Sequence, residues 1–214
     1  MTDQQFVLKI ISTLAILLPL FINLLRIKKA GLVGWLFLCF LFMGFFSDVL
    51  MWYLYIKSVK GISGPVFTLY SLFEALFFFW VIQYLTESSV LKSIARIFLF
   101  AAFPLWIGGF FIYPLFIEGQ TAQYIPFSTA YEVITSFLSG FALLYLAEHE
   151  KMILRMGSFW FFLALFFYCF CTFFIMSMLG SFLSLSLWPL NNIINIITYI
   201  FYSVGLWCYT KSKV

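Results

Sequence analysis

The feature that most constrains this chain is a succession of apolar stretches, each long enough to cross a lipid bilayer. A membrane-spanning helix needs about 20 mostly apolar residues. By that rule the expected helices cover residues 6–25, 32–56, 65–85, 93–117, 124–147, 158–179 and 189–209. The links between them are short, which favours antiparallel packing of consecutive helices. We therefore expect an all-α fold, a bundle of seven transmembrane helices that forms one domain over residues 1–214.

Composition narrows the class of protein further. Only 9% of the 214 residues are charged and 64% are hydrophobic, whereas a soluble domain has about 25% charged residues. The net charge of +4 is small and scattered, so we expect the lipid bilayer as a partner and no nucleic acid. The four cysteines lie in apolar stretches and are expected to be core side chains. No cofactor and no metal site are predicted.

The distribution of Lys and Arg predicts an orientation. The links after the first, third and fifth expected helices, together with the C-terminal tail, hold nine basic residues, and the other side holds three. Cytoplasmic loops of membrane proteins carry an excess of Lys and Arg. We therefore expect the N-terminus outside and the C-terminus in the cytoplasm, with a multi-pass location in the cell inner (plasma) membrane. The start, MTDQQ, lacks a basic region, so the first stretch is expected to be a retained helix.

Three acidic residues lie inside apolar stretches. Asp48 precedes Lys57 by nine residues, Glu74 follows Pro65 by nine, and Glu132 lies as far from the outer end of its own stretch. At the helical rise per residue, each lies roughly 13 Å into the membrane, near its midplane. An acid at that depth costs about 2.5 kcal/mol or more, so it usually faces a partner or a wet cavity. We expect the three carboxyls to meet in one chamber.

Uncharged polar residues form stripes that should face the same chamber. Residues 191, 195, 198 and 202 are spaced by four, three and four, which places them on one helix face. The predicted ligand-binding residues are Asp48, Tyr70, Glu74, Ser128, Glu132, Asn191, Asn195, Thr198 and Tyr202. No buried Lys or Arg is expected as a counter-charge, so at least one carboxyl should be protonated.

Three functions are consistent with such a site. The first is a receptor-like, ligand-binding membrane module whose pocket opens to the outer side and takes a small cationic or lipidic ligand. The short cytoplasmic links would then require a membrane or cytoplasmic signalling partner. The second is a small proton- or cation-coupled transporter. The third is an intramembrane lipid-modifying enzyme using Asp48, Glu74 and Glu132 for acid–base chemistry, although we favour a protein that is not an enzyme.

Some segments resemble known membrane proteins. The segments carrying Glu74 and Glu132, together with NNIINIITYIFYSVGLWC, resemble an uncharacterised family of small bacterial seven-helix membrane proteins. That resemblance implies the fold and no established activity. FMGFFSDVLMWYL is similar to a helix of lysoplasmalogenase-type proteins, and this similarity implies a catalytic role for Asp48. The stretch FWFFLALFFYCFCTFFIM lacks the second Asp of that family.

Overall fold

The computed structural model describes residues 3–57, 63–109, 125–177 and 184–209. Every regular element in these ranges is helical. The elements are α1 (Asp3–Ala15), α2 (Leu17–Ile56), α3 (Ser63–Leu85), α4 (Ser89–Ile107), α5 (Ile125–His149), the short 3-10 helix η3 (Ile153–Arg155), α6 (Gly157–Ser177) and α7 (Ser184–Cys208).

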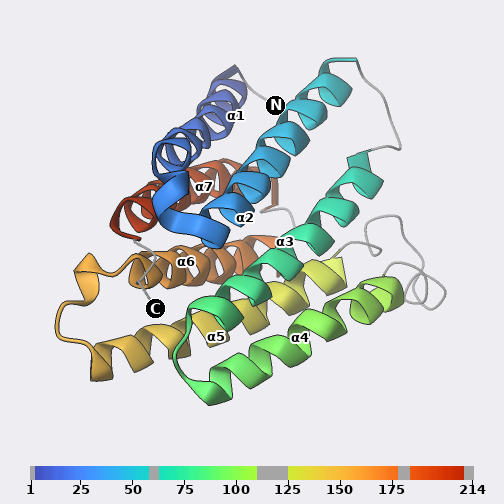
Figure 1. Cartoon of the computed structure of the whole chain (residues 1–214). Helices are drawn as coiled ribbons and strands as arrows, with labels where there is room; N and C mark the ends of the chain where they lie inside the picture. Colours follow the sequence, from blue (N-terminus) through green and yellow to red (C-terminus); the bar gives the residue numbers. More distant parts are fainter. Residues whose placement is uncertain (1–2, 58–62, 110–124, 178–183, 210–214) are drawn as a thin grey trace.

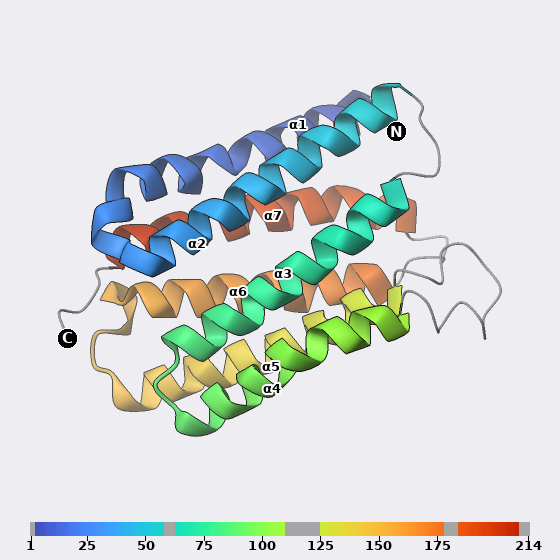
Figure 2. The ribbon, with the colours of Figure 1, turned by 45° about the vertical axis from the view of Figure 1, so that its right-hand side comes forward.

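The helices lie alongside one another as an elongated bundle (Figure 1). Figure 2 shows α1 and α2 along one side and α4 and α5 along the opposite side, with α3, α6 and α7 between them. Helix α7 packs against α1, α2 and α6, while α3 packs against α2, α4 and α5. The central position of α7 brings its polar face against helices from the beginning of the chain.

The first two expected helices are joined without an intervening loop, which corrects the boundary at residue 25. Helix α1 ends at Ala15, four residues before Pro19, because a proline ring clashes with the carbonyl group four residues earlier. The helix resumes at Leu17 and continues through the basic segment to Ala30. At Gly31 the backbone has φ 59° and ψ −133°, and the chain turns back within α2 (Figure 2). Glycine adopts this conformation without the steric cost of a Cβ atom.

The surface of the bundle suits a lipid environment. Phe100, Leu25 and Phe137 are among many large apolar side chains that are mostly exposed, whereas Ser139 and Thr135 are fully buried. This pattern is the reverse of that of a soluble protein, where extended apolar surface is rare. Within the described ranges, five helical segments are long and apolar enough to cross a membrane: Phe6–Leu54, Gly64–Leu85, Ser89–Ile107, Phe127–His149 and Gly157–Ile175. The chain is therefore a multi-pass helical membrane protein by length and composition.

The expected count of seven spans is not reproduced by these five segments. The first two expected helices fall within the single 49-residue run Phe6–Leu54, which contains the turn at Gly31. Helix α7 is not among the five, since Asn191, Asn192 and Asn195 lower its mean hydropathy. The expected helix at 93–117 corresponds to α4, which ends at Ile107, and residues 110–117 lie outside the described ranges.

Aromatic rings and close backbone contacts hold the centre of the bundle together. Phe37 of α2 stacks on Phe161 of α6, with ring centroids 4.4 Å apart. Helices α6 and α7 approach closely where Gly157 faces the end of α7. A Cβ atom added at Gly157 would lie 2.6 Å from the Cβ of Tyr209. Small residues at such crossings allow close backbone approach in membrane helices. This packing fixes the position of the polar face of α7.

Candidate functional site

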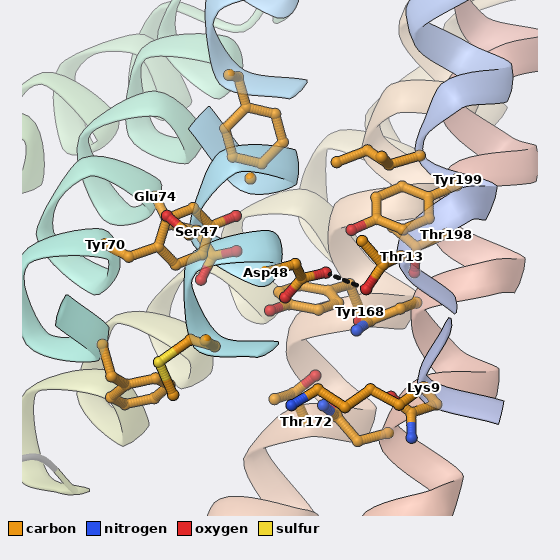
Figure 3. Close-up of a pocket in the computed structure, with 18 of the residues that line it drawn as sticks. Lys9, Thr13, Ser47, Asp48, Tyr70, Glu74, Tyr168, Thr172, Thr198 and Tyr199 are labelled. Carbon is orange, nitrogen blue, oxygen red and sulfur yellow. Dashed lines mark hydrogen bonds between the residues drawn. The ribbon is translucent and has the colours of Figure 1, made fainter. Parts of the chain in front are cut away.

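A cavity of about 180 Å³ lies between α1, α2, α3, α6 and α7. It extends from the end of the bundle where α1, α3 and α7 begin towards the middle of the helices. Gly44 is part of its wall, and a Cβ atom there would lie 3.3 Å from the Tyr70 hydroxyl oxygen. Figure 3 shows Lys9 and Thr172 at one end of the site and Tyr70 and Glu74 on another side, with Asp48 between them.

The cavity includes most of the sequence-predicted site residues. Those on its wall are Asp48, Tyr70, Glu74, Asn191, Asn195, Thr198 and Tyr202. The spacing of residues 191, 195, 198 and 202 predicted a polar stripe on one face of α7. All four residues of this stripe line the cavity. Sequence reasoning did not select Lys9, Thr13, Thr172, Tyr168 or Tyr199, which also line the cavity.

Several polar atoms on this wall lack a protein partner. The hydroxyl oxygens of Thr172, Thr198 and Tyr202 and the amide oxygen of Asn191 are buried and have no hydrogen-bond partner among the described residues. Leaving a buried polar group unpaired costs about 1–3 kcal/mol. Such groups are normally satisfied by ordered water or a ligand. Four of them around one cavity give its wall hydrogen-bonding capacity that no described residue uses.

Asp48 lies in a small polar cluster formed with α1. The Thr13 hydroxyl donates to Oδ2 of Asp48 at 3.0 Å. Lys9 lies one helical turn from Thr13, is half-buried on the cavity wall, and interacts electrostatically with Asp48. This contradicts the expectation that no buried Lys or Arg supplies a counter-charge. The spacing of Lys9 and Thr13, four residues apart and so on one face of the helix, was the signal available in the sequence.

Glu74 occupies a more enclosed position, with only 4% of its surface exposed. The Tyr131 hydroxyl of α5 donates to Oε2 of Glu74 at 2.5 Å. The Tyr70 and Tyr168 hydroxyls lie close enough to interact with the same carboxyl group. Tyr168 in turn packs edge-on against Phe78, with ring centroids 5.9 Å apart. Tyrosines of three helices therefore hold this acid at the cavity wall.

Glu132 does not join the other two acids in the cavity, which corrects the expectation of one chamber for all three. None of the described residues of α5 belongs to the cavity wall, so Ser128 is outside it as well. Glu132 is 1% exposed, its Oε2 has no partner among the described residues, and it interacts electrostatically with Glu74. The sequence places Glu132 at the same depth in the membrane as the other two acids. Its neighbour Tyr131, however, lies on the face of α5 that points to Glu74. Glu132 lies behind the wall instead.

The arrangement suits binding of a small polar molecule. The cavity is smaller than the roughly 300–1,000 Å³ of pockets for drug-sized ligands. Its carboxyls offer acceptors to a cation, and tyrosine and phenylalanine rings can contribute cation–π attraction. Among the described residues, no group of three or more His, Cys, Asp or Glu side chains could hold a metal ion.

Comparisons of the chain with protein-family models, curated proteins and solved structures found no match.

Proposed function

We propose that this protein is a receptor-like membrane module that binds a small organic cation, either a free amine or the cationic head of a lipidic molecule. The observation that carries the proposal is the cavity itself. It combines two carboxyls, Asp48 and Glu74, with four buried polar atoms that have no partner among the described residues. A protonated amine with its hydration water would satisfy the unpaired acceptors and hydroxyls. The ammonium charge would offset a carboxylate.

The position of Glu74 favours a cation over a neutral ligand. Asp48 has Lys9 nearby, whereas Glu74 has no basic residue on its side of the cavity wall. A buried carboxylate without a counter-charge is unstable in a low-dielectric site. We propose that Glu74 keeps a proton while the cavity is empty. When a cation enters the cavity, it supplies the missing positive charge, and Glu74 releases its proton to water.

For the topology, we propose seven crossings of the cell inner (plasma) membrane. The run Asp3–Ala30, which joins α1 to the first part of α2, would form the first crossing, and residues 32–56 the second. The cavity mouth lies at the end where α1, α3 and α7 begin, which the basic-residue distribution assigns to the outer side. The described links between helices are short, so a signal would pass to a separate membrane or cytoplasmic partner.

The experiment is a thermal-stability titration of the full chain in lipid nanodiscs, with butylamine as the probe. A ligand that binds only the folded state raises the midpoint as its concentration exceeds Kd. We expect the shift to be lost in Glu74→Gln, which removes the carboxyl for the ligand, and in Asp48→Asn, which leaves the positive charge of Lys9 on the cavity wall without an acid to offset it. The shift should be retained in the matched control Glu87→Gln, whose side chain is exposed. Equal shifts in all four proteins, or no shift in the wild type, would contradict the proposal.

A second function, proton- or cation-coupled transport, has one observation in its favour. Behind the cavity, α5 carries a buried polar stripe that begins at Ser128 and continues past Glu132 towards the other end of the bundle: Ser128, Glu132, Thr135, Ser136 and Ser139. Polar residues inside membrane helices often mark ion or proton pathways. Amine uptake into proteoliposomes that depends on Glu132 would establish transport, and binding without uptake would leave the receptor-like function.

A further inference from the structure

Lys9 introduces a positive charge into a site otherwise suited to cations. Lys9, Asp48 and Glu74 are the basic and acidic residues on the described cavity wall. Lys9 comes from α1, one turn nearer the helix start than Thr13, whose hydroxyl binds Asp48. In Figure 3, Lys9 lies next to Thr172, below Asp48 and Thr13, and across the site from Glu74 and Tyr70. Lys9 is therefore on the Asp48 side of the cavity and away from Glu74.

These three residues divide the cavity into two parts. Lys9 lies on the cavity wall one helical turn from Thr13, the hydrogen-bond partner of Asp48, so its positive charge is on the Asp48 side of the cavity. Glu74 is surrounded by tyrosine hydroxyls and has no cationic partner among the described residues. In a low-dielectric site a buried charge is tolerated when it is paired. Only one position for an external positive charge then remains.

We propose that Lys9 is a specificity-determining residue that limits the ligand to a single positive charge. This inference rests on the proposed function, since it concerns the cation bound in the same cavity. The Lys9 amine occupies the anionic subsite at Asp48, and an external monocation takes the subsite at Glu74. A dication has no second carboxylate available and must place its other ammonium group near the like charge of Lys9. Replacing Lys9 by a neutral side chain opens the Asp48 subsite to a second ammonium group.

The test compares two probes of equal carbon length, butylamine and 1,4-diaminobutane, on the full chain in nanodiscs. Both carry fully protonated amines near pH 7, because an alkylamine of the lysine type has a pKa of about 10.4. The wild type should bind butylamine more tightly than the diamine. In Lys9→Met and Lys9→Gln the ratio of the two Kd values should shift at least ten-fold towards the diamine. Lys9→Arg, which keeps the charge, and Lys92→Met, a cation outside the cavity, should keep the wild-type ratio.

The outcomes separate this inference from the proposed function. If the wild type binds neither amine, the proposed function fails. If the wild type binds butylamine but prefers the diamine, the inference is overturned without any variant, so a poorly folding variant cannot hide the answer. If Lys9→Met leaves the ratio unchanged, or abolishes butylamine binding, Lys9 does not limit ligand charge and the proposed function stands on its own evidence.

Discussion

Replacing Tyr131 by Phe tests the contact that holds Glu74 at the cavity wall. The substitution removes the hydroxyl that donates to Glu74 at 2.5 Å. It keeps the ring, which packs against Phe127 and Phe78 with centroid distances of 5.5 and 6.4 Å. Tyr131 is 3% exposed, so bulk water does not replace the lost donor. The measured change in stability is therefore that of a single hydrogen bond.

The size of the loss reports the charge of Glu74. A hydrogen bond between neutral groups in a membrane bundle contributes about 0.6 kcal/mol and rarely above about 1.7 kcal/mol. A bond to a charged group contributes about 1.5–3 kcal/mol. Because we propose a protonated Glu74 in the empty cavity, we expect Tyr131→Phe to cost about 1 kcal/mol without ligand. With saturating butylamine, when Glu74 is ionised, the cost should rise to about 2 kcal/mol.

The assay is reversible unfolding in mixed micelles, with and without butylamine. Tyr84→Phe is the matched control, since Tyr84 lies on α3 and is 46% exposed. A double-mutant cycle of Tyr131→Phe with Glu74→Gln isolates the pairwise term. If Tyr131→Phe costs no more than Tyr84→Phe, the hydroxyl does not hold Glu74. A cost that is the same with and without butylamine would refute the change in charge.

Three further substitutions test the turn within α2, the contact between α6 and α7, and the hydrogen bond to Asp48. Gly31→Ala should cost about 1–3 kcal/mol in unfolding free energy, because only glycine adopts its positive φ of 59° without strain; a neutral result would place the turn elsewhere. Gly157→Ala should cost about 1–3 kcal/mol because its Cβ would lie 2.6 Å from an atom at the end of α7, while Gly108→Ala, with open space around it, should lack this clash. Thr13→Val should lower the unfolding free energy by about 1 kcal/mol, since the Thr13 hydroxyl donates to Asp48 at 3.0 Å. In an Asp48→Asn background the same substitution should cost less. Additive costs of the two substitutions would disprove the contact.

Sequence reasoning located the polar groups by depth along each helix. That method was sufficient for Asp48 and Glu74, which lie at similar depth on neighbouring helices and both reach the cavity. It also sufficed for the α7 stripe, since a spacing of three and four residues defines a helix face. Depth does not define the rotation of a helix about its axis. Glu132 has the right depth, but it lies behind the wall because the preceding Tyr131 takes the position facing Glu74.

Lys9 was missed for a different reason. A count of basic residues at helix ends treats each one as belonging to a water-exposed loop, whereas Lys9 is half-buried on the cavity wall. Its burial depends on the contact of α1 with α2 and α7, which no single segment encodes. The turn at Gly31 was similarly hidden, since a basic link followed by glycine was expected to be a loop and is helical up to Ala30.

The most direct test of the central claim is the access of a cationic thiol reagent to cysteines placed on the cavity wall and behind it. In a background without the native cysteines, Ser47→Cys and Glu132→Cys are treated in nanodiscs with a trimethylammonium-bearing methanethiosulfonate, and modification is measured by mass spectrometry. A cavity that admits small cations and is lined by Ser47 but not by Glu132 predicts rapid modification at 47 and none at 132. Equal modification at both positions, or protection of both, would contradict it.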